Sequence, residues 1–221
     1  MPGYMIHLSV CNEEVRGNRA FILGVESPDL LKKYLKQYDI EGVEEKYNSL
    51  WVDGMPNFSE LKERVCQKES KDSNLGLHYG VSSSPDIVAF YSGLSEEQKN
   101  SSFYKGYLWH LLTDKIMYAK LKIEEKLEQN ISAFTGMDKS AFIEFEKDRL
   151  HSDWDKTNFL IQKRYGVELT PEVVELNVVG FINDSNLCYI DWEIVKNVID
   201  SLCRINPLRV DMLDLIDMII D

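Results

Sequence analysis

Apolar residues recur at helical spacing along most of the chain, and few segments show the alternation that strands require. The two longest periodic stretches run from 101 to 129 and from 138 to 165, and Gly166 follows the second as a helix stop. Two Ser-Pro-Asp triplets, Ser27-Pro28-Asp29 and Ser84-Pro85-Asp86, each precede an apolar run and indicate helix starts. The pattern predicts an all-α fold.

Other segments refine this prediction. The stretch 39–57, with two glycines and a proline, indicates a loop, and 58–69 indicates a more polar helix. The segment 178–190 departs from helical spacing, because short apolar runs flank Asn183-Asp184-Ser185-Asn186, and it predicts a small β-hairpin. Asn206-Pro207 indicates the start of the last helix.

Composition limits the classes of function. The 221 residues include 37 acidic and 25 basic side chains, and the formal charge of −12 disfavours binding to nucleic acid or to anionic membranes. No run reaches the roughly 18 apolar residues of a transmembrane helix, and the first residues show no secretory leader. The four cysteines form no C-x-x-C pair, which is typical of reduced thiols and predicts a cytoplasmic protein.

The four histidines are the main candidates for chemistry. His110 and Asp114 stand four residues apart in a predicted helix, so both project from one face. Gly106, one turn earlier, would let another segment or an ion approach that face closely. An imidazole and a carboxylate on one helical face are half of a metal site. The alternative is a core histidine that hydrogen-bonds to Asp114 alone.

The remaining histidines give weaker signals. His151 and Asp155 repeat the same spacing in the next long helix, where the alternative is a surface contact. His78 lies between two glycines in a loop-like segment, and His7 follows apolar residues near the N-terminus. The sequence motifs of serine hydrolases, of nucleotide-binding loops and of H-E-x-x-H metalloproteases are absent.

Five motifs occur in a defined order. They are Met1-Pro2-Gly3 with His7, Leu23 to Asp29, Gly76-Leu77-His78, Tyr104 to Asp114, and His151 with Asp155. Together they resemble the zinc-dependent phospholipase C family over about residues 1 to 160. The all-helical fold of that family is shared with single-strand-specific nucleases. The most specific motif is G-Y-x-x-H-x-x-x-D, which runs from Gly106 to Asp114.

The resemblance implies a metal centre for one to three zinc ions, or for other divalent cations. Asp29 would be both a ligand and the catalytic general base for water. The implied ligands are Asp29, His78, His110 and Asp114 at the first metal, Asp114 and His7 at the second, and His151 and Asp155 at the third.

Some positions leave alternatives open. The family usually has a further histidine shortly after the long-helix motif, and Lys115 to Lys120 contains none, so the third site would lack a ligand. Asp86 is a rival of Asp29 that breaks the family's order of motifs. Asp153 is a rival of Asp155, although it would not share a helical face with the nearby histidine.

Sequence and resemblance together predict a single helical domain, with a metal-binding core over 1–166 and a C-terminal helical extension of the same domain over 167–221. The predicted function is a metal-dependent phosphoester hydrolase that acts on a small phosphoester or a phospholipid through metal-activated water. The alternative is a non-catalytic helical protein with a reduced structural metal site that binds a partner. A nuclease is disfavoured by the charge of −12. The oligomeric state stays open.

Overall fold

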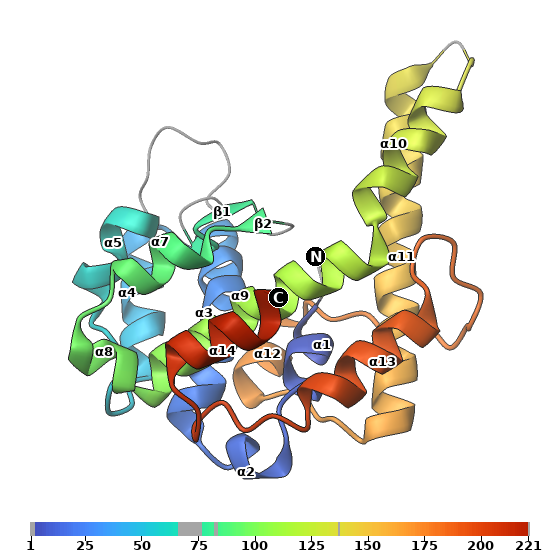
Figure 1. Cartoon of the computed structure of the whole chain (residues 1–221). Helices are drawn as coiled ribbons and strands as arrows, with labels where there is room; N and C mark the ends of the chain where they lie inside the picture. Colours follow the sequence, from blue (N-terminus) through green and yellow to red (C-terminus); the bar gives the residue numbers. More distant parts are fainter. Residues whose placement is uncertain (1–2, 66–76, 82–83, 137, 221) are drawn as a thin grey trace. The chain divides into compact units, whose positions relative to one another are not determined.

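The computed structural model describes residues 3–65, 77–81, 84–136 and 138–220 (Figure 1). The predicted all-α class is confirmed, because helices make up most of these residues. The strands among them are β1 (Gly80–Val81) and β2 (Ser84–Pro85), which form a short antiparallel ribbon. Gly76 and the predicted helical residues 66–69 lie outside the described residues. None of the described helices combines the length with the apolar character that a membrane crossing requires.

The chain divides into two compact units. The first unit comprises Cys11–Lys115 and Cys203–Asp221, and the second comprises Pro2–Val10 and Ile116–Leu202. The helix α9 (Ser102–Leu121) belongs to the first unit up to Lys115 and to the second from Ile116. The division expected at residue 166 stays a prediction.

The first unit contains α3 (Arg19–Gln37) and the first part of α9. Its other described elements are the β1–β2 ribbon, α2 (Glu13–Arg16), α4 (Ile40–Ser49), α5 (Phe58–Val65), α7 (Ile87–Ser92), α8 (Glu96–Asn100) and α14 (Met212–Ile220). The helix α3 packs on α2 and α4, and α4 packs on α5. Phe21, Phe103 and Leu108 are among its completely buried side chains.

The helix α3 begins earlier than the sequence pattern predicts. Asn18 caps it by accepting a hydrogen bond from Phe21 N at 3.0 Å. The predicted start at Ser27 is therefore wrong, and Pro28 lies inside the helix. A proline there cannot donate to the carbonyl of Gly24, four residues earlier. The cost is tolerated because α3 is buried on both sides of the proline.

A helix also replaces the loop predicted over 39–57. The helix α4 occupies half of that stretch, and its cap Asp39 accepts a backbone hydrogen bond at 2.9 Å. Val43 and Tyr47, four residues apart, are its buried positions. The loop prediction was wrong because two buried residues among charged neighbours make too sparse a helical pattern.

Aspartates begin two later helices. Asp86 caps α7, so a helix does follow the second Ser-Pro-Asp triplet, as predicted. The last helix, α14, begins at Met212, and Asp211 before it accepts a backbone hydrogen bond at 2.8 Å. The predicted start at Asn206 is wrong, because its side chain accepts a hydrogen bond from Leu208 N within a turn instead.

The second unit is organised on one long helix. Its described helices besides the end of α9 are α1 (Tyr4–Ser9), α10 (Ile123–Ala133), α11 (Lys139–Tyr165), α12 (Pro171–Leu176) and α13 (Trp192–Leu202). Both α1 and α10 pack on α11. The stretch predicted over 101–129 is interrupted at Lys122, whose φ of 51° is left-handed. The predicted stop of α11 at Gly166, with φ of 61°, is confirmed.

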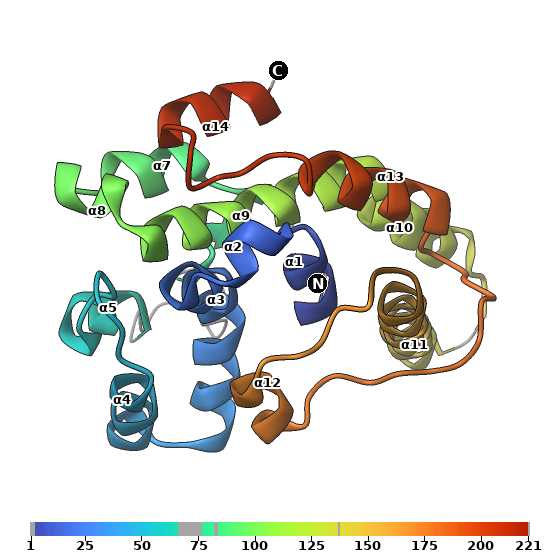
Figure 2. The same cartoon turned by 90° about the horizontal axis from the view of Figure 1, so that it is seen from below.

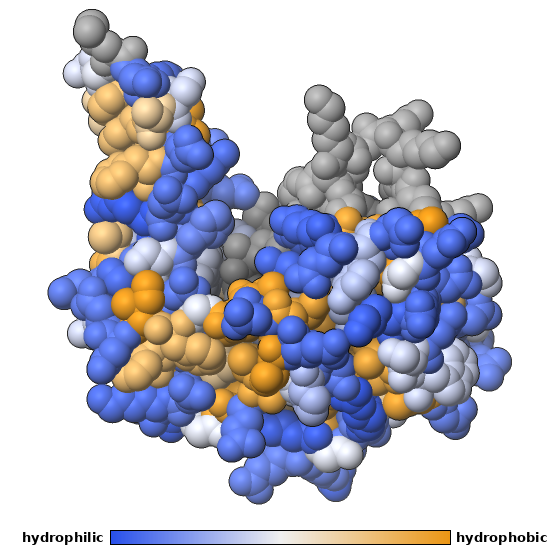
Figure 3. All heavy atoms as spheres, turned by 180° about the vertical axis from the view of Figure 1, so that it is seen from behind, coloured by the Kyte–Doolittle hydropathy of each residue, from blue (hydrophilic) through white to orange (hydrophobic). Residues whose placement is uncertain are grey.

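The α10–α11 hairpin of the second unit carries apolar side chains on its surface (Figure 3). The rings of Phe134 and Phe142 stack with their centroids 3.9 Å apart and close the hairpin near its tip. Phe145 follows on α11 and is 55% exposed. These aromatic residues are therefore hairpin contacts rather than part of a central core.

The hairpin predicted over 178–190 is wrong, because this segment contains no strand. Much of its backbone hydrogen-bonds to α11. One carboxylate oxygen of Asp153 accepts hydrogen bonds from the backbone N–H groups of Cys188 to Ile190, at 2.6 to 3.3 Å. Ile182 N donates to Asp155 O at 3.1 Å. These bonds occupy groups that a strand ladder would need.

The buried thiol of Cys11 should resist alkylation. Burial raises its pKa to about 12, although Arg16 partly opposes this rise, so little thiolate forms at pH 8. Cys188 is exposed and should react before Cys11. Iodoacetamide labelling followed by peptide mass mapping checks this order, with the unfolded protein in urea as the control in which Cys11 also reacts. Equal labelling rates for Cys11 and Cys188 in the folded protein would contradict the prediction.

Candidate metal centre

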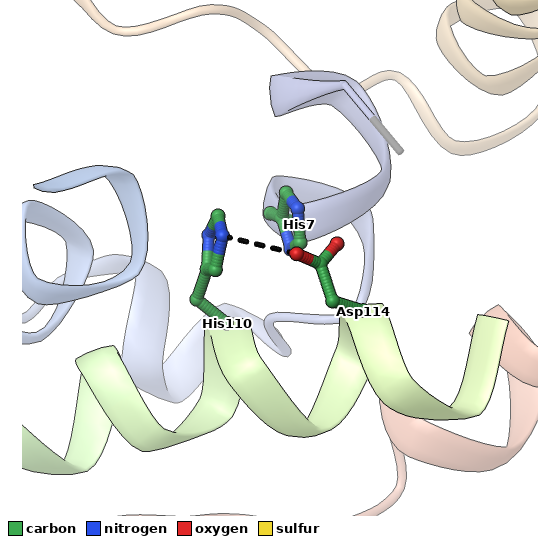
Figure 4. A group of neighbouring side chains, drawn as sticks. All are labelled: His7, His110 and Asp114. Atoms are coloured by element: carbon green, nitrogen blue, oxygen red, sulfur yellow. Dashed lines mark ion pairs between the residues drawn. The ribbon is translucent and has the colours of Figure 1, made fainter. Parts of the chain in front are cut away.

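Two of the predicted ligands share one face of α9. His110 and Asp114 lie one turn apart and are almost completely buried, and His110 Nε2 is 3.5 Å from Asp114 Oδ2 (Figure 4). Their neighbours Trp109 and Leu111 are also completely buried. A carboxylate in such surroundings needs a cation or several hydrogen-bond donors.

A close contact between α3 and α9 brings Asp29 to this pair (Figure 2). A Cβ atom on Gly24 would lie 1.9 Å from Phe103 O, and one on Gly106 would lie 2.1 Å from Phe21 O. The two backbones therefore touch at both glycines, where any side chain would force the helices apart. The expectation that Gly106 lets another segment approach closely is confirmed.

His78 reaches the same point from a third segment. It precedes the β1–β2 ribbon and is completely buried. Its Nε2 atom lies 3.2 Å from His110 Nε2, 3.7 Å from Asp114 Oδ2 and 3.8 Å from Asp29 Oδ1. The four side chains Asp29, His78, His110 and Asp114 thus form one buried group within the first unit, the His–Asp cluster. They are the residues that the sequence resemblance assigns to a first metal.

A backbone carbonyl fixes the orientation of His110. Its Nδ1 atom lies 2.8 Å from Val25 O. Because a carbonyl can only accept, Nδ1 carries the hydrogen, and Nε2 of the neutral ring keeps its lone pair for the cluster. Val25 belongs to α3, so the helix that carries Asp29 also orients the imidazole of α9. Metal-binding histidines are typically held by such a bond on the second nitrogen.

The pKa values of the two histidines move in opposite directions. Burial lowers the pKa of His78 to about 4, with help from the nearby His110 and against the attraction of the two carboxylates. His78 is therefore neutral at pH 7. Burial also tends to lower the pKa of His110. The charge of Asp114, a hydrogen bond to Asp114 and the charge of Asp29 together outweigh burial, so the pKa of His110 is raised. A cation that binds both rings must displace any proton from His110.

The donor set suits a divalent cation. Ligand atoms about 2.0 to 2.1 Å from a tetrahedral zinc ion lie about 3.3 Å from one another. His78 Nε2 lies 3.2, 3.7 and 3.8 Å from His110 Nε2, Asp114 Oδ2 and Asp29 Oδ1, and His110 Nε2 lies 3.5 Å from Asp114 Oδ2. Asp29 Oδ1 is buried and accepts no hydrogen bond from any described residue. A divalent cation would add positive charge between the two buried carboxylates. Manganese or iron would also accept these ligands.

The other predicted ligands belong to the second unit. His7 lies on α1, and its role as a ligand stays a prediction. His151 is exposed on α11, Asp155 is half-buried one turn later, and no ion pair joins them. A Cβ atom on Gly180 would lie 2.4 Å from the carboxyl group of Asp155, so this glycine leaves the room that the carboxylate occupies. The third metal site likewise stays a prediction.

The two rival aspartates have other contacts. Asp86 is exposed and caps α7. Asp153 is buried, and its carboxylate binds the backbone of Cys188 to Ile190. In the first unit the structure therefore brings Asp29, and not Asp86, to the histidines.

One contributor to the cluster was missed by sequence reasoning. The Val25 carbonyl leaves no signal in a sequence, because every residue has one. Gly24 lies within the motif from Leu23 to Asp29, but its close contact with α9 was not predicted. Comparison of the chain with protein-family models, with curated proteins and with solved structures finds no match.

Proposed function

We propose that the His–Asp cluster binds a divalent cation, with zinc as the first candidate, and that the protein is a metal-dependent phosphoester hydrolase. The observation that carries the proposal is that buried His78 Nε2 lies 3.2 to 3.8 Å from His110 Nε2 and from a carboxylate oxygen of each of two aspartates, Asp114 and Asp29. If His110 only stabilised the core of α9, a hydrogen bond to Asp114 would be enough, and neither His78 nor Asp29 would be needed beside it. The resemblance to the zinc-dependent phospholipase C family, which assigns the same four residues to one metal, supports the same function.

The residues of the cluster have distinct roles in this proposal. A bound zinc ion supplies Lewis acidity toward a phosphoryl oxygen and toward water. Asp29 is the catalytic general base and accepts a proton from the attacking water. Its side chain is 7% exposed, against 1% for Asp114, so it is the carboxylate nearer to solvent. As the water oxygen bonds to phosphorus, the bond to the leaving oxygen breaks, and that oxygen departs as an alcohol by taking up the proton that Asp29 accepted.

The proposed substrate is a small phosphoester or a phospholipid, and the proposed location is the cytoplasm, where an exposed thiol such as Cys188 stays reduced. The charge of −12 argues against nucleic acid as the substrate. The proposal also includes a second and a third ion. Additional ligands for them would be His7, His151 and Asp155.

Elemental analysis and a hydrolysis assay test the function together. We expect at least one equivalent of zinc in protein purified without added metal. We also expect hydrolysis of bis(p-nitrophenyl) phosphate or a short-chain phosphatidylcholine that stops on chelation and returns with zinc. Binding of no divalent metal, even after reconstitution, would refute the proposal.

A second candidate is a non-catalytic protein in which one structural cation holds the first unit together. Two observations favour it: Lys115 to Lys120 lacks the histidine that the family has, and His151 is exposed. This candidate predicts one equivalent of zinc, a large loss of thermal stability on chelation and no hydrolysis of either phosphodiester. The hydrolase predicts turnover that depends on zinc.

A further inference from the structure

Tyr107 lies on α9 three residues before His110 and is almost completely buried. Its hydroxyl donates a hydrogen bond to Leu77 O, the carbonyl that directly precedes His78. Its ring meets that of Tyr79, the residue after His78, edge to face with centroids 6.3 Å apart. Tyr107 therefore contacts the chain on both sides of His78 without belonging to the His–Asp cluster.

The described residues around His78 do not form one continuous helix or strand. His78 and Tyr79 lie in a turn, and Tyr79 has a φ of 55°, a left-handed conformation that is unfavourable for an aromatic residue. Asp86 N donates to Tyr79 O at 2.8 Å, and Phe90 packs on the Tyr79 ring at 5.0 Å. Such a conformation persists only where surrounding contacts fix it.

Phe90 links these contacts back to α9. Its ring stacks on Tyr107 with centroids 5.3 Å apart and planes at 18°. The three rings of Tyr79, Phe90 and Tyr107 thus form one packed group behind His78. Within this group, the Tyr107 hydroxyl makes a hydrogen bond that joins α9 to the backbone of the His78 segment.

We propose that Tyr107 is a positioning residue, which holds the Leu77–Tyr79 segment against α9 so that His78 Nε2 faces His110, Asp114 and Asp29. This inference rests on the proposed metal binding of the cluster. The helix α9 then has two roles in the site, because it carries the proposed ligands His110 and Asp114 and also holds His78 in position. Loss of a partner that binds a metal ligand directly typically lowers metal affinity about 10- to 100-fold, and Tyr107 contacts the backbone next to His78 rather than its ring, so we expect the lower end of that range.

Tyr107→Phe tests the proposal, because phenylalanine keeps the packed ring and removes only the hydroxyl. Tyr47→Phe is the matched control: Tyr47 is also buried in the first unit, and its hydroxyl donates to Pro56 O at 3.1 Å, a contact outside the cluster. Both variants should unfold at similarly reduced temperatures. Only Tyr107→Phe should raise the zinc dissociation constant, by about tenfold, and change the visible spectrum of the cobalt-substituted protein.

A second readout uses the metal-free protein. The ring signals of His78 in NMR should shift or broaden in Tyr107→Phe and stay unchanged in Tyr47→Phe, because the imidazole loses its fixed orientation. Unchanged His78 signals and unchanged zinc affinity in Tyr107→Phe would overturn the positioning role and leave the metal site standing. Changed His78 signals in a protein that binds no zinc would refute the proposed function and keep the positioning of His78 by Tyr107.

Discussion

Tight zinc binding should be lost when Asp114 is replaced by asparagine, with a fall in affinity of more than about 100-fold. Changing a group that merely supports a ligand costs about 10- to 100-fold, and Asp114 Oδ2 faces both histidines directly. Asparagine keeps the size of the side chain and removes its charge. The cation would then face two imidazoles and Asp29 as its sole buried carboxylate in the cluster.

Calorimetry and thermal unfolding measure this loss. A ligand at 100 times its dissociation constant stabilises a protein by about 2.7 kcal/mol, so zinc at that level should raise the melting temperature of the wild type by several degrees. The same zinc concentration should leave that of Asp114→Asn almost unchanged. Asp148→Asn is the matched control, since Asp148 is an exposed aspartate on α11. Wild-type zinc affinity in Asp114→Asn would show that the cluster is not the metal site.

Replacing Gly106 with alanine should destabilise the first unit by about 3 kcal/mol. The new Cβ would lie 2.1 Å from Phe21 O, a backbone atom that can move only with α3. If α3 moves away, Asp29 and the Val25 carbonyl move with it, so the zinc affinity of the folded variant should fall as well. The stability loss and the affinity loss thus have one geometric cause.

Chemical denaturation and zinc titration of Gly106→Ala check both effects. Gly17→Ala is the control, because the nearest atom to its added Cβ lies at 3.8 Å and the position is exposed. Its free energy of unfolding should stay within about 0.5 kcal/mol of the wild type. A Gly106→Ala protein as stable as Gly17→Ala would mean that α3 and α9 are less tightly packed than the structure indicates.

Features that depend on residues within a single helix could be predicted from the sequence. The i, i+4 spacing of His110 and Asp114, with Gly106 one turn earlier, predicted the shared face and the close approach of another segment. The stop at Gly166 was equally local. These features depend on a few neighbouring residues, and helical geometry alone fixes them.

The predictions that were wrong concern features that depend on contacts between segments far apart in the sequence. The start of α3 was placed at Ser27 because proline is favoured in a first turn, whereas burial of the whole helix tolerates Pro28 in its interior. The segment 178–190 was predicted as a hairpin, since local alternation cannot show that Asp153 accepts its backbone hydrogen bonds. Residue order suggested the partners of the cluster, but the Val25 carbonyl became visible only in three dimensions.

The separation of these partners along the chain has a consequence for folding. His78 is 32 residues from His110, and the Val25 carbonyl that orients His110 is 85 residues away. Closing such loops costs entropy before any cation can be held by the full set of ligands. A nascent chain that has formed only α9 offers His110 and Asp114 alone, from which a cation exchanges quickly. If the cluster binds a cation as proposed, slow exchange would begin once α3 and the Leu77–Tyr79 segment have docked on α9, so retention of the metal would report the docking of these three segments.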